Sequence, residues 1–169
     1  HRGEVKAALV LMGYMNPFLQ YGLERFADDA ARAGVHGVIV PDLPFEEAVT
    51  MREALRAQGI ALIPLVGPNT SEERMRLYAD VSEGYAYVVS VMGTTGVRSA
   101  LPPEVRDVLA RARRIFPIPV ALGFGLKEPA QLAAIPEDAR PDAAVFGSSL
   151  LKHLDAGGSP QEFMKTWTV

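Results

Sequence analysis

The sequence predicts an α/β fold with a parallel β-sheet and helices packed outside it. Six apolar, strand-like runs alternate with amphipathic helical patterns, and the loops between them are short. The runs are nearly continuous in Val, Ile, Leu and Ala, which is typical of strands buried on both faces of a parallel sheet. Alternation of this kind fits either a doubly wound open sheet or part of a (β/α)8 barrel.

Each predicted strand is a short apolar run. The six strands are expected at Ala7–Met12, Gly37–Val40, Ala61–Val66, Tyr85–Val91, Pro119–Leu122 and Ala143–Phe146. A full barrel takes about 250 residues and eight strand–helix units. Six units in 169 residues therefore predict one domain over residues 1–169, which as a barrel is incomplete by about two units.

Helical periodicity fills the segments between these strands. One helix is predicted where apolar residues share a face, at Leu23, Phe26, Ala27 and Ala30. The segment 45–59 repeats the pattern and stops at Gly59, a residue suited to the end of a helix. Thr70 and Glu73 stand at the spacing of a capping box, which predicts a helix start. Further helices are expected over 102–116, 128–135, 148–154 and 159–167.

Composition excludes several classes of site and partner. The net charge is −3 with both signs mixed along the chain, so no nucleic-acid partner is expected. Cysteine is absent and the three histidines are scattered, so no metal site is expected. No apolar run reaches the roughly 20 residues of a membrane span, and no signal peptide is visible. The cytoplasm is the expected location.

Three predicted strand ends share a composition that suits anion binding. They are rich in Gly and Ser and precede helices, at 93–96, 123–125 and 147–149. Such ends expose backbone N–H groups, and the helix dipole adds partial positive charge. The glycines could instead serve only tight turns. Because active-site loops of α/β folds gather at one edge of the sheet, three such ends together favour a phosphate site.

Other strand ends carry an aromatic pair, a carboxylate and a long loop. Tyr85 and Tyr87 are two residues apart and therefore point to one face of their strand, where they fill the core or line an aromatic pocket. Asp42 ends a strand and is either functional or a cap for nearby N–H groups. The loop Met92–Leu101 is a candidate lid.

Five collinear motifs give the sequence a family resemblance that covers essentially all 169 residues. They read LMGYMNPFLQYGLERFADDAARAGVHGVIVPDLPFEEA, PNTSEER, YAYVVSVMGTTGVR, ALGFGLKEPAQL and DAAVFGSSL. In this order they resemble the tryptophan synthase alpha chain family. The resemblance implies a (β/α)8 TIM barrel, a lyase of tryptophan biosynthesis that cleaves indole-3-glycerol phosphate into indole and glyceraldehyde 3-phosphate.

The resemblance also assigns site residues by motif. It implies that the substrate phosphate is held by Gly96, Gly125, Leu126, Gly147 and Ser148. It implies an indole pocket formed by Tyr14, Val40, Leu65, Tyr87 and Phe124. Thr95 would lie in the lid loop, and Asp42 and Pro44 would lie in a loop that faces a partner chain.

The partner implied by the resemblance is a tryptophan synthase beta chain in an α2β2 heterotetramer. In that family the beta chain carries pyridoxal phosphate and receives indole through a tunnel, so no cofactor is expected in this chain. The only other binding partner implied is the small phosphorylated substrate. No metal and no membrane are expected.

The resemblance places both catalytic acids upstream of His1. In this family two carboxylates come from the second strand and the loop after it, whereas this chain begins at what would be the third strand. The chain alone is therefore expected to release little or no indole. Two further departures are Thr94 and Ser149, which stand where the family usually has an aliphatic residue and Ala.

Two alternatives remain open at this stage. The chain could be a non-catalytic fragment that binds a phosphate ligand or the beta chain. It could also be a different phosphate-binding barrel enzyme, although the segments YMNP, PDLP and GTTG argue against that reading.

Overall fold

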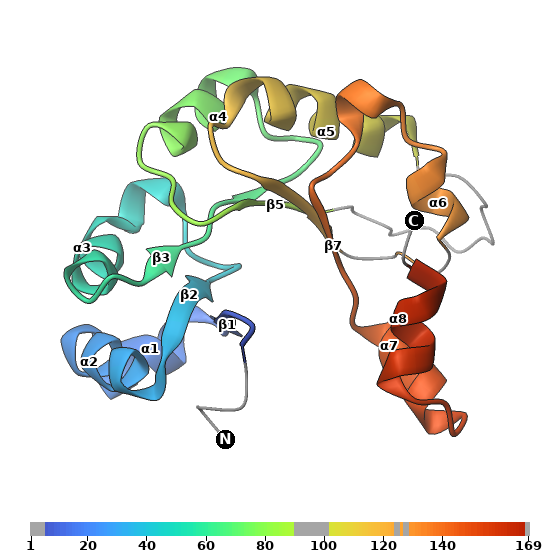
Figure 1. Cartoon of the computed structure of the whole chain (residues 1–169). Helices are drawn as coiled ribbons and strands as arrows, with labels where there is room; N and C mark the ends of the chain where they lie inside the picture. Colours follow the sequence, from blue (N-terminus) through green and yellow to red (C-terminus); the bar gives the residue numbers. More distant parts are fainter. Residues whose placement is uncertain (1–5, 90–101, 124–125, 127–128, 168–169) are drawn as a thin grey trace.

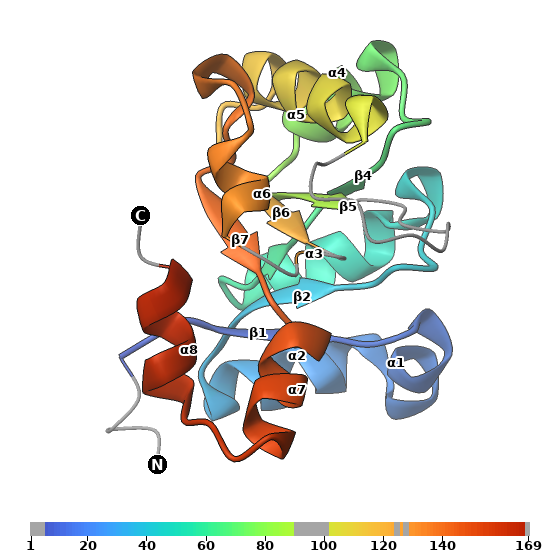
Figure 2. The ribbon, with the colours of Figure 1, turned by 90° about the vertical axis from the view of Figure 1, so that its right-hand side faces the viewer.

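The chain forms a curved wall of parallel strands with helices on its outer side. The computed structural model describes residues 6–89, 102–123, 126 and 129–167. In Figure 1 the strands line the inside of an arch, and helices cover its outside from α1 and α2 at one end to α7 and α8 at the other. The view in Figure 2 shows β1, β2 and β5 running across the molecule, with α4 and α5 above them and α1 and α2 below. This arrangement is an α/β barrel wall that does not close within the described residues.

The strands are parallel neighbours in chain order. Their bounds are β1 (Leu9–Met12), β2 (Val35–Ile39), β3 (Ala61–Leu62), β4 (Leu65–Val66), β5 (Ala86–Val89), β6 (Val120–Gly123) and β7 (Ala143–Val145). They form two sheets, ordered β1-β2-β3 and β4-β5-β6-β7, and every pairing is parallel.

The helices follow the strands as the apolar periodicity predicts. Their bounds are α1 (Met15–Tyr21), α2 (Leu23–Ala33), α3 (Val49–Ala57), α4 (Glu72–Ala79), α5 (Pro103–Ile115), α6 (Ala130–Ala133), α7 (Ser148–Asp155) and α8 (Pro160–Trp167), with short 3-10 turns η1 (Phe45–Glu47) and η2 (Glu137–Ala139). The predicted helix over 45–59 is divided into η1 and α3, with Ala48 between them.

One predicted strand is interrupted by a proline. The run 61–66 forms β3 and β4 with Ile63 and Pro64 between them, because Pro64 has no N–H to give to a strand ladder. The wall nevertheless continues across the break. The Ile63 N–H donates to the Val38 carbonyl at 2.9 Å, and the Tyr87 N–H donates to the Pro64 carbonyl at 2.9 Å. Pro64 thus marks the seam between the two sheets.

The predicted capping box at Thr70 was wrong by one residue. Ser71 is the N-cap of α4, and its hydroxyl accepts from the Arg74 N–H at 3.2 Å. The Thr70 hydroxyl instead accepts from the Gly67 N–H at 3.0 Å, which closes the turn after β4. Two adjacent hydroxyl residues compete for the capping role, and the turn uses the first of them.

Two buried clusters hold the helices to the outer face of the wall. The smaller, N-terminal cluster packs α1, α2 and α3 on β2 and contains Phe18, Ala27, Ala30, Val35, Val38, Val40, Met51, Leu55 and Ile60. The larger, C-terminal cluster packs α4, α5 and α8 on β5 and β6, and its members include Met75, Val88, Val105, Leu109, Leu122, Phe163 and Trp167. A third cluster of Ile39, Ile63 and Tyr87 lies on the inner face.

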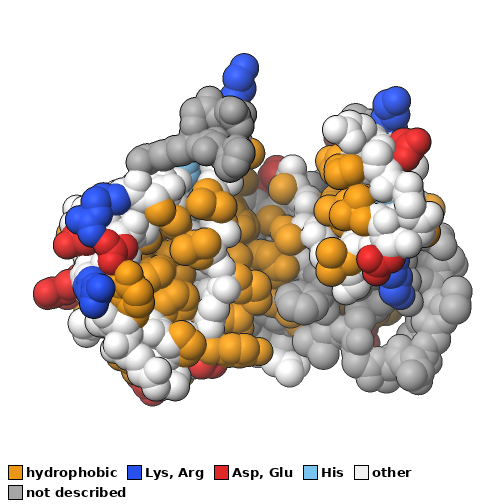
Figure 3. Space-filling model, turned by 90° about the horizontal axis from the view of Figure 1, so that it is seen from below, with side chains coloured by type: hydrophobic (Ala, Val, Ile, Leu, Met, Phe, Trp, Pro, Cys, Tyr) orange, Lys and Arg blue, Asp and Glu red, His pale blue; other side chains and the backbone are white. Residues whose placement is uncertain are grey.

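Apolar side chains remain accessible at both ends of the wall. β1 and β7 are the outermost strands of their sheets, as expected for a barrel wall with two edges. Leu9 and Met12 of β1 are 46% and 53% exposed, and Val145 of β7 is 37% exposed. Figure 3 shows hydrophobic side chains gathered on the open side of the arch.

Candidate functional site

The carboxyl ends of β6 and β7, after which two of the predicted phosphate-binding segments begin, lie side by side. Leu122 pairs with Ala144 and Gly123 with Val145, so the segments that follow these strands begin at the same edge. Gly147 is the N-cap of α7, and its carbonyl accepts from the Leu151 N–H at 3.1 Å. No side chain caps this helix, so the N–H groups of its first turn are not satisfied by a local cap.

Gly147, which precedes α7, borders open space. A Cβ added at Gly147 would meet no heavy atom within 4 Å among the described residues, and the following Ser148 is exposed. The helix N-terminus also carries partial positive charge. This edge can therefore accept an anion through backbone N–H groups and the Ser148 hydroxyl.

Tyr87 reaches across β6 to the same edge. A Cβ added at Gly123 would lie 1.9 Å from the Tyr87 hydroxyl oxygen and 2.2 Å from its ring carbon Cζ. The glycine therefore admits the phenol, which lies directly against the β6 backbone. This close approach places an aromatic ring beside the strand end that leads into the segment 124–125.

The inner face next to Tyr87 is apolar. Leu65 of β4 pairs with Tyr87 of β5, and both belong to the inner cluster with Ile39 and Ile63. The rings of Tyr85 and Tyr87 lie 6.5 Å apart at an angle of 40°. Burial raises the pKa of both phenols, and the neighbouring Tyr85 raises the pKa of Tyr87 further. Both tyrosines therefore line one apolar surface as neutral phenols.

Val40 lies away from this surface. It packs in the outer N-terminal cluster with Phe18 and Met51, whereas the preceding residue, Ile39, packs with Tyr87 on the inner face. Successive side chains of a strand point to opposite faces, so only one of the two can face inward. Ile39 and Ile63 are inner residues that the sequence reasoning missed. Counting alternate positions back from Leu65 finds Ile63, whereas Ile39 lies on β2 and is placed only by the pairing of β2 with β3.

Asp42 connects the loops after β1 and β2. Its Oδ1 accepts from the Met15 N–H at 2.9 Å, so it caps the start of α1, which has no cap of its own. Asp42 therefore acts as a helix cap, which was one of its two predicted roles. It caps α1 and not the helix that follows Asp42 in the chain. Tyr14, the residue before Met15, is 66% exposed at the end of β1 and makes no described contact with Tyr87.

The remaining predicted residues divide into two groups. Leu126 is 4% exposed and packs in the outer C-terminal cluster, so its side chain is structural and only its backbone is available to a ligand. Pro44 is exposed in the loop after β2, where it precedes η1. The predicted positions Gly96, Thr95, Phe124 and Gly125 lie outside the described residues.

Metal-binding clusters and membrane-spanning helices are both lacking from the described part of the chain. Within it, no three or more His, Asp or Glu side chains are grouped so that they could hold a metal ion. Over the same residues, no helix combines the length and the apolar character needed to cross a membrane.

Comparison with known proteins identifies the relatives of this chain. The family model described as "Tryptophan synthase alpha chain" matches residues 1–167. The tryptophan synthase alpha chain of Desulfovibrio desulfuricans is 66% identical over 166 residues, which cover 98% of this chain and 65% of that protein. The corresponding chain of Nitratidesulfovibrio vulgaris is 62% identical and is covered to 64%. This chain therefore spans about two thirds of the length of these relatives.

Solved structures of the same family share the fold of this chain. A chain from a structure of the tryptophan synthase α2β2 complex of Pyrococcus furiosus superposes with a TM-score of 0.86 at 36% identity, covering 97% of this chain and 66% of that one. A mutant tryptophan synthase alpha-subunit from the same organism gives a TM-score of 0.83 at 34% identity, with the same coverage. The prediction of an incomplete (β/α)8 barrel is confirmed.

Proposed function

The chain belongs to the tryptophan synthase alpha chain family, and from this premise we propose that it forms the substrate-binding side of an indole-3-glycerol phosphate lyase. The lyase converts indole-3-glycerol phosphate into indole and glyceraldehyde 3-phosphate. In this proposal the ends of β6 and β7 hold the phosphate, and the inner face around Tyr87 holds the indole ring. The enzyme acts in the cytoplasm.

One observation carries this proposal: the Tyr87 phenol lies against Gly123, beside the open N-terminus of α7. An apolar surface and an uncapped helix start are thereby adjacent. The substrate has the same two parts, a flat aromatic ring and a phosphate joined by a short chain. Because burial keeps both tyrosines neutral, the inner face suits the ring, and the helix N-terminus suits the phosphate charge.

The predicted site residues take these roles in the proposal. Gly147, Ser148 and the Leu126 backbone contact the phosphate together with Gly125 and Gly96. Tyr87, Leu65, Phe124 and Tyr14 surround the indole, and Ile39 takes the place first expected for Val40. Thr95 belongs to the lid loop.

The chemistry needs groups beyond these binding residues. The bond from indole C3 to the glycerol phosphate chain breaks, C3 gains a proton, and the adjacent hydroxyl loses one as it becomes the aldehyde. Asp42 is a poor candidate for this step because its carboxylate is engaged by the Met15 N–H. We assign the proton transfers to the two carboxylates that the family resemblance implies, which the resemblance matches to no residue of this chain.

The proposed partner is a tryptophan synthase beta chain carrying pyridoxal phosphate. The Pyrococcus furiosus relative was solved as part of an α2β2 complex. Asp42 and Pro44 are both exposed, in the loop after β2, and are the proposed contact to that partner. The Asp42 bond to Met15 holds this loop against the start of α1, which gives a partner two connected loops to bind.

Substituting Ser148→Asp tests the phosphate site with little risk to folding. Ser148 is exposed at the start of α7, where an acidic residue favours the helix but repels a phosphate dianion. In the intact gene product, we expect KM for indole-3-glycerol phosphate to rise about tenfold or more.

Ser159→Asp is the matched control for that experiment. Ser159 caps α8, where its hydroxyl accepts from the Glu162 N–H at 3.2 Å and donates to the Glu162 carboxylate at 3.0 Å. Asp keeps the capping bond and loses only the second bond, which lies at α8 and not at the start of α7. This variant should keep the original KM. An unchanged KM for Ser148→Asp would remove α7 from the phosphate site, and absence of indole release by the unaltered gene product would favour a non-catalytic binding role.

A further inference from the structure

A cavity lies on the outer side of the wall, at the seam between the two sheets. It has a volume of about 210 Å³ and opens between α3 with its preceding turn η1 on one side and the end of α4 on the other. Its floor is the interrupted strand, from Leu62 through Pro64 to Leu65. Ile63 and Leu65, which also belong to the inner cluster, contribute to its lining, whereas Ile39 of β2 and Tyr87 of β5 do not, so the cavity shares the interrupted strand with the inner face and opens between the helices outside it.

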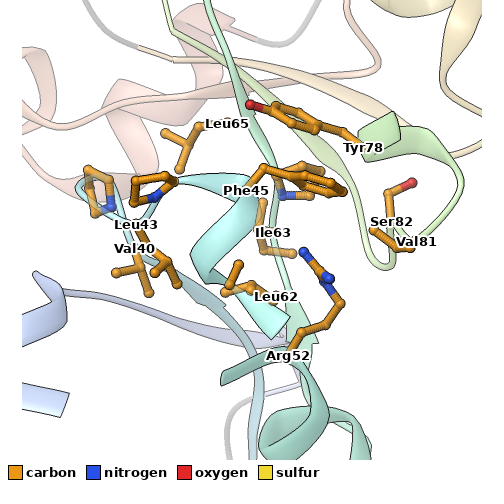
Figure 4. Close-up of a pocket in the computed structure, with 14 residues that line it drawn as sticks. Val40, Leu43, Phe45, Arg52, Leu62, Ile63, Leu65, Tyr78, Val81 and Ser82 are labelled. Atoms are coloured by element: carbon orange, nitrogen blue, oxygen red, sulfur yellow. The ribbon is translucent and has the colours of Figure 1, made fainter. Parts of the chain in front are cut away.

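The cavity is lined by apolar and aromatic side chains together with two polar ones, Arg52 and Ser82. Phe45 and Tyr78 stack with ring centroids 4.6 Å apart and an interplanar angle of 26°. The Arg52 guanidinium carbon lies 4.9 Å from the centre of the Phe45 ring. Figure 4 shows Arg52 extending from its helix toward Phe45 and Ile63, between the apolar side chains of both walls.

Arg52 has no acidic partner among the described residues. Glu46 pairs with Arg74 at 2.9 Å and Glu83 with Arg56 at 2.8 Å. Burial lowers the pKa of the Arg52 guanidinium from its ordinary value and the like charge of Arg56 lowers this pKa further, whereas the charges of Glu53 and Glu83 oppose the shift. A partly buried cation without a close counter-ion carries a desolvation cost that an anion bound beside it would reduce.

We propose that this cavity is a binding site for a small aromatic monocarboxylate, with Arg52 contacting the carboxylate. A cavity of about 150 Å³ lined by aliphatic and aromatic residues is enough to bind benzene, so the present volume admits one ring with a carboxyl group. The planar guanidinium matches a carboxylate through two parallel N–H bonds. One cation among apolar walls fits a monoanion better than a phosphate dianion.

The test is a calorimetric titration of the intact gene product with benzoate and with benzamide, which has the same shape without the charge. Saturable benzoate binding tighter than that of benzamide is the expected result. Arg52→Gln should weaken benzoate binding about tenfold and leave benzamide unchanged. Ala48→Leu, which fills the cavity from its 3%-exposed wall position, should abolish binding of both.

Arg56→Gln is the matched control. Arg56 lies one turn further along α3, outside the cavity, and pairs with Glu83. This variant should bind benzoate as the unaltered protein does. Equal affinity for benzoate and benzamide, no saturation up to about 10 mM benzoate, or equal losses in the Arg52 and Arg56 variants would each overturn the assignment. The comparison of the two ligands needs no variant, so it decides the role of charge even if Arg52→Gln fails to fold.

Discussion

The two sheets on either side of Pro64 differ in how their two faces are used. The C-terminal sheet β4–β7 is covered outside by the larger cluster, with Leu109 and Leu122 fully buried, and its strand ends carry Gly147 and Ser148. The N-terminal sheet β1–β3 rests on the smaller cluster, and its first strand leaves Leu9 and Met12 about half exposed.

This difference separates two kinds of binding. Backbone N–H donors can hold an anion only where the backbone is fixed, and the larger core fixes β6, with which the edge strand β7 pairs. An apolar surface for a partner chain needs accessible side chains instead, such as Leu9 and Met12 of the N-terminal sheet. The ring surface proposed for the substrate lies at Tyr87 and Leu65, in the same sheet as Gly123, so the ring surface and the phosphate site meet within the C-terminal sheet.

Truncating a core residue in the C-terminal half should have the largest effect. Leu109 on α5 is fully buried in the larger cluster, so Leu109→Ala should lower the free energy of unfolding by about 2–5 kcal/mol through lost contacts and a residual cavity. Urea unfolding followed by the fluorescence of Trp167, which lies in the same cluster, measures this change.

Leu55→Ala makes the same truncation in the N-terminal half. Leu55 on α3 is 1% exposed in the smaller cluster. If the two halves are separate cooperative units, this variant should shift the far-ultraviolet circular dichroism transition but leave the Trp167 transition in place. Equal shifts of both signals by both variants would show that the two halves unfold together. Pro64 would then interrupt the hydrogen bonds between strands without dividing the cooperative unfolding of the chain.

A smaller effect is expected from Gly123→Ala, where the two binding surfaces meet. The added Cβ would overlap the Tyr87 ring, so the ring must move, at a cost of about 1–3 kcal/mol in unfolding free energy. Chemical denaturation measures that cost, and KM for the substrate should rise because Tyr87 is displaced from the inner face.

A second substitution identifies the cause of that loss. In a Tyr87→Leu background the clash is absent, so Gly123→Ala should then cost much less, and the difference is the coupling energy between the two positions. Additive losses in this double-mutant cycle would mean that Gly123 is required for a reason other than the approach of Tyr87.

Most of the wall could be predicted from the sequence because its elements depend on local patterns. Continuous apolar runs identified the strands, and helical patterns identified α2 to α8. Pro64 interrupts the strand over 61–66, but the residues on both sides of it are apolar. The sequence therefore predicted one strand where the structure has the ends of two sheets. The helix start at Ser71 was missed because Thr70 offers the same chemistry one position earlier.

The features that escaped prediction depend on distant residues. Val38, Ile39 and Val40 are all buried, so their hydrophobicity does not tell which of them faces inward. The glycine at 123 suggested space for a ligand, whereas the structure shows that it makes space for Tyr87, a residue on another strand. The cavity beside Arg52 likewise joins segments from both sides of the seam, which no single motif describes.

The smallest predicted effect compares one aspartate from each half under acid. The Val120 N–H donates to Asp142 at 2.8 Å and, with Arg113 at 2.7 Å, lowers the pKa of this carboxyl. In the N-terminal half, the Tyr21 hydroxyl and then Arg32 lower the pKa of Asp29. A carboxyl whose pKa is lowered by folding stabilises the protein above its ordinary pKa of about 3.9, and this contribution is lost as the pH falls through the folded value.

Asp142→Asn and Asp29→Asn should therefore each reduce the urea midpoint near neutral pH and have little effect at about pH 3. Salt distinguishes the two sites. Asp29 is held first by the Tyr21 hydroxyl and then by exposed arginines, so the part of its contribution that comes from Arg25 and Arg32 should shrink in about 1 M salt, where the Debye length is about 3 Å. Asp142 is held mainly by a backbone N–H of β6, so its contribution should persist. An equal loss at both positions in high salt would mean that Arg113, and not the strand, holds Asp142, and that the C-terminal edge is no more fixed than the N-terminal one.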